Sequence, residues 1–203
     1  MNRRGLIIVF SGPSGVGKGT LLKKVMENTD NIMISVSATT RQPREGEIDG
    51  VSYHFISKDE FEKMINNNEM LEYAIYNNNY YGTPLTFVEQ CRDKGIDVVL
   101  EIEVVGAKKI KEKCPDAVMI FVMPPEVKTL RHRLEKRNTE DENTIEKRLN
   151  IAIDEIKSAD IYDYIIVNDD LDKSVMELKS ILISEKCRIK NNQKLIEEVL
   201  FNV

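Results

Sequence analysis

The sequence predicts an α/β fold in which a parallel β-sheet is flanked by helices. The main evidence is a set of short, largely apolar runs: Leu6–Phe10, Ile96–Ile102, Ala117–Val122 and Tyr164–Val167. Such runs are typical of strands that are buried on both faces of a sheet. Segments with helical spacing lie beside them, and strands that alternate with helices indicate right-handed βαβ units.

The helices follow from the spacing of apolar residues and from their flanking signals. They are expected over residues 19–28, 104–113, 125–136, 144–158 and from 171 to the C-terminus. The last one is either continuous or interrupted near Asn191 and Asn192. A highly charged stretch, residues 136–142, separates two of these helices and indicates a lid.

Between about Ser37 and Val88 the pattern changes. Short strand-like pieces such as Val51–Phe55 and Glu72–Tyr76 lie among segments rich in Asn and Gly, which favour turns. We therefore expect a small subdomain that is inserted into the α/β core.

Composition excludes several classes of protein. The 203 residues suffice for one domain, and 41% hydrophobic with 31% charged residues argues against a disordered or fibrous chain. Three widely spaced cysteines predict neither a disulfide framework nor a metal site. No apolar run approaches the ~18 residues of a membrane span, so we expect a cytoplasmic protein without a membrane partner. A net charge of −5 argues against nucleic acid as a partner.

A glycine-rich loop directly follows the first predicted strand. It consists of Gly12, Pro13, Ser14, Gly15, Val16, Gly17, Lys18, Gly19 and Thr20. The offsets of Gly12, Gly17 and Lys18 match the P-loop, whose backbone N–H groups and lysine bind nucleotide phosphates at a helix N-terminus. A simple turn between strand and helix is the alternative. The preceding strand and following helix favour the P-loop, which predicts a site for nucleotide phosphates.

One position departs from the general P-loop. Gly19 stands where most such loops have the Ser or Thr that contacts Mg²⁺, and the hydroxyl comes one residue later, at Thr20. The Gly-Lys-Gly-Thr form resembles nucleoside monophosphate kinases.

Further segments along the chain resemble guanylate kinases, which transfer a phosphoryl group from ATP to GMP. The resemblance covers almost the whole chain. The segments that carry it, besides the P-loop, are Ser37–Glu47, Asp49–Phe55, Asn79–Thr83, Leu134–Glu140, Glu146–Leu149 and Val167–Asp169.

The resemblance implies a single domain over residues 1–203. Its P-loop core would comprise residues 1–36, 88–127 and 154–203, its GMP-binding subdomain residues 37–87, and its lid residues 128–153. It also implies ATP and Mg²⁺ as cofactors and GMP, with dGMP, as acceptor. Whether copies of the chain form a homo-oligomer stays open.

The inserted segment carries groups suited to a monophosphate. Arg41 and Arg44 lie three residues apart, and two guanidinium groups can clamp a phosphate. Tyr53 and Tyr81 can donate further hydrogen bonds, and by resemblance all four bind the phosphate of GMP. Solvated arginines and half-buried tyrosines are the alternative.

Glu72 is the candidate for reading the base. Guanine presents two adjacent donors, N1–H and its amino group, which one carboxylate can accept, whereas adenine has an acceptor at N1. By resemblance Ser37, Thr83 and Glu103 lie beside it. The alternative is an exposed glutamate on an edge strand.

Two acids, Glu101 and Glu103, end a predicted buried strand. Their spacing places both on one face at the carboxyl edge of the sheet, where α/β proteins bind ligands. We expect Glu101 and Thr20 to hold Mg²⁺ through water and Glu103 to lie near guanine. Solvated strand-end acids are the alternative.

The lid supplies three arginines, Arg133, Arg137 and Arg148. Phosphoryl transfer depends on positioning and on neutralising charge, which arginines can do on closure. We expect Lys18, Arg41, Arg137 and Arg148 to be catalytic and Arg133 to bind ATP.

Asn168 follows the last predicted strand. It is expected to border the adenine, or else to cap a helix.

Two other functions remain to be weighed. One is a small kinase with a different acceptor, against which a combination of five residues argues: Arg41, Arg44, Tyr53, Glu72 and Tyr81. The other is a catalytically silent protein-interaction module of guanylate-kinase type. Such modules have typically lost the P-loop lysine, which this chain retains as Lys18.

Overall fold

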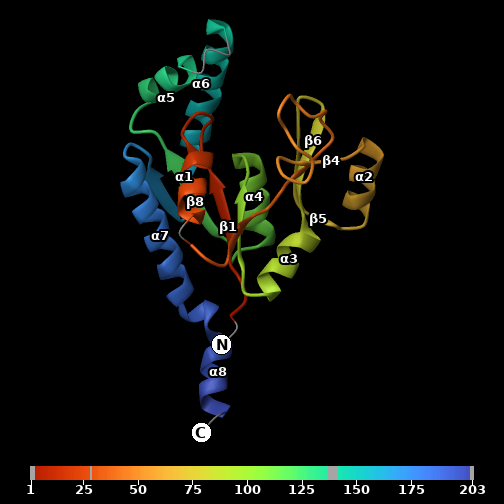
Figure 1. Ribbon diagram of the computed structural model, residues 1–203, viewed down its shortest axis with the longest axis vertical. Coiled ribbons are helices and arrows are strands. Elements are labelled where there is room, and N and C mark those ends of the chain that lie inside the picture. The colour runs from red at the N-terminus through yellow and green to blue at the C-terminus, as the bar shows by residue number, and fades with distance from the viewer. Residues whose placement is uncertain (1–2, 28, 137–140, 202–203) are drawn as a thin grey trace.

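A five-stranded parallel sheet forms the centre of the computed structural model, which describes residues 3–27, 29–136 and 141–201 (Figure 1). The strands lie in the order β2 (Ile32–Ile34), β7 (Asp97–Glu101), β1 (Ile7–Ser11), β8 (Val118–Met123) and β9 (Tyr164–Val167). All neighbouring strands pair in parallel. The predicted α/β class is therefore confirmed.

Helices cover both faces of this sheet (Figure 1). Those of the core are α1 (Lys18–Met26), α3 (Leu85–Asp93), α4 (Val104–Lys113) and α7 (Leu171–Cys187). Two further helices, α5 (Val127–Glu135) and α6 (Glu142–Lys157), pack against each other at the end of the molecule that carries the P-loop (Figure 1).

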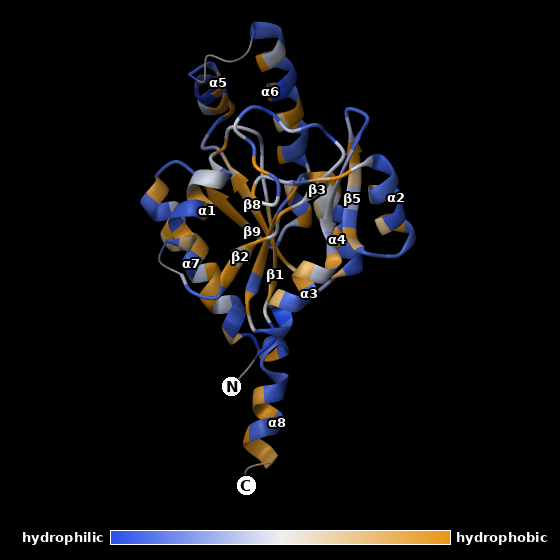
Figure 2. Ribbon diagram, turned by 45° about the vertical axis from the view of Figure 1, so that its right-hand side comes forward, coloured by the Kyte–Doolittle hydropathy of each residue, from blue (hydrophilic) through white to orange (hydrophobic). Residues whose placement is uncertain are grey.

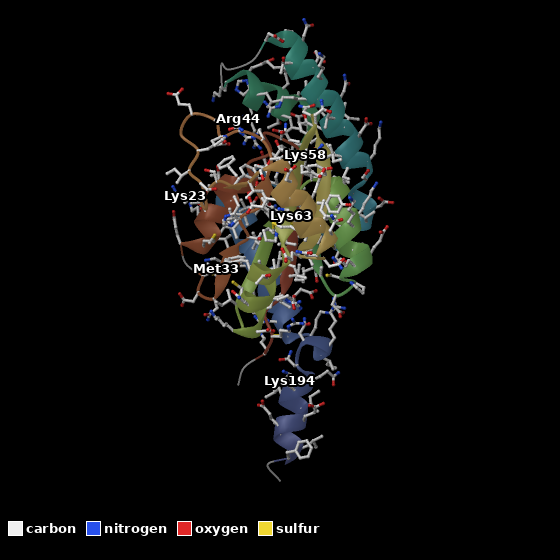
Figure 3. All side chains as sticks on the ribbon, turned by 90° about the vertical axis from the view of Figure 1, so that its right-hand side faces the viewer. Lys23, Met33, Arg44, Lys58, Lys63 and Lys194 are labelled. Atoms are coloured by element: carbon white, nitrogen blue, oxygen red, sulfur yellow. The ribbon has the colours of Figure 1, made fainter. Side chains whose placement is uncertain are left out.

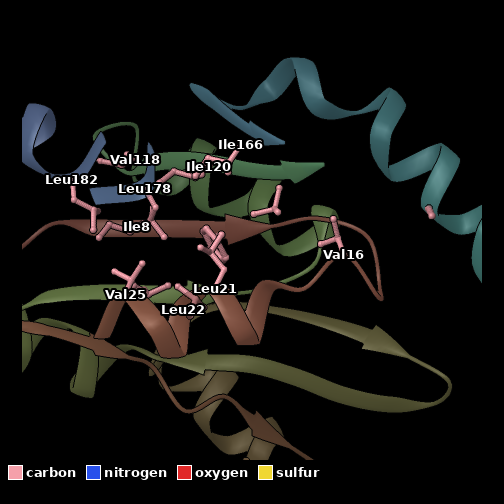
Figure 4. Packing of buried hydrophobic residues seen from close by; sticks show 14 of the residues in the cluster. Ile8, Val16, Leu21, Leu22, Val25, Val118, Ile120, Ile166, Leu178 and Leu182 are labelled. Atoms are coloured by element: carbon pink, nitrogen blue, oxygen red, sulfur yellow. The ribbon is translucent and has the colours of Figure 1, made fainter. Parts of the chain in front are cut away.

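The central strand β1 is buried on both faces, and its first four residues, Ile7–Phe10, are apolar. Ile8 and Phe10 are buried in one core with residues of α1 and α7, such as Leu21 and Leu178 (Figure 4). Alternate residues of β1, among them Val9, belong to a second core that includes residues of α3 and α4. Since successive side chains of a strand point to opposite faces, burial of both faces favours a continuous apolar run such as Ile7–Phe10 (Figure 2).

A smaller sheet and one helix form the inserted region. Its strands lie in the order β4 (His54–Phe55), β3 (Ala38–Thr39), β6 (Asn79–Pro84) and β5 (Met70–Tyr76), next to α2 (Lys58–Asn66). The side chain of Phe61 on α2 is fully buried against this sheet. Asn77 and Asn78 join β5 to β6 with positive φ angles of 46° and 61°, which Asn tolerates better than most residues. The prediction that this Asn tract forms a turn is confirmed.

Several elements differ from the sequence-based expectation. β2, α2 and α3 were not predicted. β2 has only three residues, and α2 and α3 lie within or next to the inserted region, where the sequence pattern indicated short strands and turns. The C-terminal helix, by contrast, is interrupted near Asn191 and Asn192, which is one of the two alternatives that the sequence left open: α7 ends at Cys187, a 3₁₀ turn covers Ile189–Asn191, and α8 (Gln193–Phe201) follows. Within the described part of the chain, no helix has both the length and the apolar character to cross a membrane.

Asp97 joins three segments at the edge of the fold opposite the P-loop. Its carboxylate is fully buried. It lies 2.8 Å from Arg3 Nη2 and 2.9 Å from Lys186 Nζ, and it accepts a 2.9 Å hydrogen bond from the backbone N–H of Leu6. One carboxylate therefore ties β7 to the residues before β1 and to α7.

We expect Asp97→Ala to lower the free energy of unfolding by about 3 kcal/mol or more, because removing one partner of a buried ion pair leaves the other charges uncompensated. Urea unfolding measures this change. The matched control is Asp93→Ala: Asp93 pairs with Arg4 but its side chain is 67% exposed, so the loss should stay below about 1 kcal/mol. Equal losses in the two variants would show that the buried pair has no special role.

Candidate active site

A cavity of about 600 Å³ opens at the carboxyl edge of the central sheet, the edge at which open α/β sheets bind ligands. Segments that lie far apart in the sequence line it together. The residues that bear on function are Gly12, Lys18, Ser37, Tyr53, Glu101 and Glu103. The structure thus brings the P-loop, the strand-end acids and part of the inserted region to one space.

The P-loop turns sharply between β1 and α1. Gly12 has φ +150°, and a Cβ there would lie 2.3 Å from the carbonyl oxygen of Val122. Gly17 has φ +99°, and a Cβ there would lie 2.6 Å from Nδ2 of Asn168. Both positions require glycine for the conformation and for space.

The N-terminus of α1 suits an anion. No side chain caps it, and no acidic residue lies in its first turn, so its N–H groups and its partial positive charge remain available to a phosphate. The Lys18 ammonium donates hydrogen bonds to the carbonyl oxygens of Gly12 at 2.6 Å and of Pro13 at 3.3 Å. The lysine therefore lies over the loop whose ligand it is expected to bind.

Residues of α5 and α6 contact the outside of the loop. Arg133 donates to the carbonyl oxygens of Val16 at 3.0 Å and of Asn168 at 2.9 Å. The side chain of Asn168 also donates to Val16 O, at 2.8 Å, and Arg148 donates to the hydroxyl of Ser14. Arg137 lies outside the described residues. Arg133 and Asn168, which we expected to touch nucleotide, here hold the loop backbone.

Three of the four residues assigned to the acceptor phosphate lie together. The Arg41 guanidinium lies 5.4 Å from the ring centroid of Tyr53, and the rings of Tyr53 and Tyr81 are 6.0 Å apart. Arg44 is exposed on the loop after β3 (Figure 3).

Glu47 holds Arg41 in place, a role that sequence reasoning missed. Its two carboxylate oxygens accept from the two Nη atoms of Arg41, each at 2.9 Å, and Oε2 also accepts from the backbone N–H of Arg44 at 2.7 Å. The hydrogen bond to Arg41, followed by the one from Arg44, lowers the pKa of the Glu47 carboxyl. The available signal was the presence of acids close to the two arginines in the same loop.

Glu72 is buried, with 6% of its surface exposed, rather than lying exposed on an edge strand. Its Oε1 accepts a 2.8 Å hydrogen bond from the hydroxyl of Thr83, so these two predicted neighbours do meet. Burial raises the pKa of the Glu72 carboxyl, and the hydrogen bond from Thr83 and the charge of Lys109 oppose that rise.

Glu101 is the last residue of β7 and Glu103 lies two residues after it; both are exposed. The register pairs Glu101 with Phe10, two residues before the P-loop begins. Glu103 is the N-cap residue of α4, and its charge contributes to the raised pKa of Glu72.

The donor set fits Mg²⁺ rather than a metal held by protein alone. Among the described residues no group of three or more His, Cys, Asp or Glu could hold a metal ion. Mg²⁺ commonly keeps several waters and binds through one or two carboxylates and substrate phosphates. The hydroxyl of Thr20 and the carboxylate of Glu101 are compatible with that mode.

Glu155 on α6 is a second residue that sequence reasoning missed. Burial raises its pKa to about 7, while the charge of Lys18 opposes that rise and the charge of Glu103 adds to it. Arg148, Ala152 and Glu155 recur at helical spacing, so one face of α6 lies toward the P-loop. That spacing was the available signal.

Comparison with known proteins agrees with this geometry. The family model described as guanylate kinase matches residues 3–185. A guanylate kinase of Clostridioides difficile (strain 630) is 50% identical over 97% of this chain and 96% of its own, and that of Latilactobacillus sakei (strain 23K) is 52% identical over 93% and 94%. The crystal structure of guanylate kinase from Anaplasma phagocytophilum superposes with a TM-score of 0.79 at 34% identity, covering 100% of this chain and 98% of that one.

Both the sequence relatives and the solved structure extend over the P-loop, the inserted region and the helices that flank the cavity. A match of that extent and identity is what common descent produces, and the chain therefore belongs to the guanylate kinase family.

Proposed function

We propose that this protein catalyses the reversible transfer of the γ-phosphoryl group of ATP to GMP, the reaction of its family, which yields ADP and GDP. One observation carries the proposal most directly. A single cavity is lined by Gly12 and Lys18 of the P-loop and by Ser37 and Tyr53 of the inserted region, so donor and acceptor can meet in it. Because the reaction uses ATP, we place it in the cytoplasm.

The acceptor phosphate is assigned to Arg41, Arg44, Tyr53 and Tyr81. The charge-assisted hydrogen bonds that arginine forms with phosphate are short and directional. Arg41 is already oriented by Glu47 and by the ring of Tyr53. Such orientation reduces the entropy that binding must lose.

Guanine selection is assigned to Glu72, with the hydroxyls of Thr83 and Ser37 and the carboxylate of Glu103 around it. Thr83 orients the Glu72 carboxylate through a 2.8 Å hydrogen bond. A buried carboxylate that can accept from two adjacent donors favours guanine strongly over adenine. The residues assigned to the acceptor bind its base and its phosphate, and none is assigned to the ribose 2′-hydroxyl. The proposal therefore includes dGMP as an acceptor.

The triphosphate of ATP is assigned to the P-loop, from Gly12 to Thr20, and to the N-terminus of α1. Lys18, Arg137 and Arg148 would neutralise the charge that develops on the transferring group, with Arg133 and Asn168 supporting the nucleotide side. Thr20 and Glu101 would hold Mg²⁺ through water. When bound, Mg²⁺ supplies further neutralisation of the phosphate oxygens.

Each of the three parts of the chain has its own role in this proposal. Residues 37–87 bind GMP, residues 128–153 form a lid, and residues 1–36, 88–127 and 154–203 form the core. Closure of the two outer parts would exclude water from the transfer.

We further propose that copies of the chain associate. The helix α8 projects from the body of the molecule (Figures 1 and 2), and its side chains Leu200 and Phe201 are 69% and 88% exposed. Apolar side chains gathered on an exposed helix favour association.

A coupled assay with MgATP and each of GMP, dGMP, AMP, UMP and dTMP tests the function. We expect GMP and dGMP to be phosphorylated well ahead of the others. Phosphorylation of AMP in preference to GMP would assign another acceptor. Binding of GMP without any turnover would indicate an interaction module.

We expect Lys18→Ala to lower kcat by about a hundredfold or more with the fold intact, because an oriented charge on the transferring phosphates contributes ~3 kcal/mol to the barrier. Steady-state kinetics and thermal unfolding measure the two quantities. Lys23→Ala is the matched control: Lys23 lies on the same helix and is exposed (Figure 3), so its kcat should not change. Near-normal turnover of the Lys18 variant would remove the P-loop lysine from the mechanism.

For Glu72→Gln we expect kcat/KM for GMP to fall between about tenfold and a few hundredfold, because an acceptor oxygen becomes a donor that faces the guanine N–H groups. Turnover of AMP should rise relative to GMP.

The pH dependence provides a second measurement on the same pair of proteins. Burial raises the pKa of the Glu72 carboxyl, so the wild-type carboxylate becomes protonated as the pH falls through that raised value. KM for GMP should therefore rise toward acid pH in the wild type and change less in Glu72→Gln. Identical profiles and identical GMP-to-AMP ratios would show that Glu72 does not read the base.

A further inference from the structure

Helix α4 is fixed against strand β5, which carries Glu72. The Lys109 ammonium lies 4.7 Å from the centroid of the Tyr73 ring and donates to the carbonyl oxygen of the same residue. One turn further along the helix, Lys113 Nζ donates to the carbonyl oxygen of Met70 at 3.0 Å. A cation over a ring and these hydrogen bonds fix the distance between helix and strand.

Gly106 lies on the same face of α4, three residues before Lys109. A Cβ at this position would lie 2.8 Å from Glu72 Oε2 and 3.3 Å from Glu72 Cδ. The other carboxylate oxygen of Glu72, Oε1, accepts from Thr83. The carboxylate therefore lies between the hydroxyl of Thr83 on one side and the bare backbone of Gly106 on the other.

Backbone conformation gives no reason for a glycine here. Gly106 is the third residue of α4 and is not among the described residues with positive φ. Glycine is less favourable than alanine within a helix, by up to roughly 1 kcal/mol in its interior. A buried glycine that weakens its helix, at the point where a carboxylate approaches, indicates that the missing side chain is what matters.

We propose that Gly106 is a positioning residue for base recognition, because the absence of its side chain lets the Glu72 carboxylate occupy the place from which it accepts the guanine N–H groups. This inference rests on the proposed role of Glu72 and deepens it. Gly106 itself need not touch the substrate. A methyl group would push Oε2 away by several tenths of an ångström or turn it, and the hydrogen bonds to the base depend steeply on that geometry.

The first test is Gly106→Ala. We expect KM for GMP to rise by about tenfold, as for a weakened hydrogen bond to a charged group, and the preference for GMP over AMP to fall. KM for ATP should change less than about twofold, because the P-loop is not in contact. Val105→Ala, at an exposed neighbouring position of the same helix, is the matched control and should match the wild type. A Gly106→Ala variant that folds normally and has wild-type GMP kinetics would overturn the proposal.

A double-mutant cycle separates positioning from simple packing, since only residues that act through one another show non-additive effects. In the Glu72→Ala background there is no carboxylate to displace, so adding Gly106→Ala should leave kcat/KM for GMP unchanged. An equal loss in both backgrounds would show that Gly106→Ala acts through helix packing and would refute the inference. A wild-type chain that does not phosphorylate GMP, or a Glu72→Gln variant with unaltered kinetics, would instead refute the proposed function.

Glu72→Asp covers the case in which Gly106→Ala does not fold. The shorter side chain withdraws the carboxylate from position 106. The double variant Glu72→Asp/Gly106→Ala should therefore fold, which thermal unfolding measures. Its affinity for GMP should be close to that of Glu72→Asp alone. Failure of the combined variant to fold would place the defect in α4 itself and contradict the proposal.

Discussion

The pairing of β1 with strands on both sides fixes where the phosphate-binding loop can lie. On one side the register sets Phe10 against Glu101, which puts an acid beside the loop. On the other side β8 brings the carbonyl of Val122 so close to residue 12 that only glycine fits. The sharp turn, the acid at the mouth of the cavity and the direction of α1 all follow from the backbone geometry of one buried strand.

Three cationic side chains that we assign to phosphate or nucleotide binding are held by groups of the protein itself. Lys18 binds carbonyl oxygens of its own loop, Arg133 binds carbonyls of two separate segments, and Arg41 is paired with Glu47. Binding of phosphate therefore exchanges one set of partners for another rather than filling an empty charged site. The net gain is small for each contact, and discrimination comes from the geometry that all contacts together require.

Sequence patterns predicted the parts of this molecule that depend on local periodicity or on fixed offsets. Buried strands such as Ile7–Ser11 and the glycine spacing of the P-loop are of this kind. Short elements such as β2 and α3 were not found, because each derives its stability from packing against the sheet rather than from its own residues. Gly106 and Glu72 approach each other only in the folded chain and lie far apart in the sequence, so no local pattern links them.

The bonds of Arg133 to the loop and to the turn after β9 have a mechanical consequence. They attach the second half of α5 to the part of the molecule that also holds the P-loop, so this half behaves as part of the frame. Arg148 of α6 is attached to the same loop through the hydroxyl of Ser14, and Leu134 and Leu149 share a hydrophobic core with Val16 of the loop. A displacement of α5 or α6 that preserved these contacts would therefore carry the loop with it.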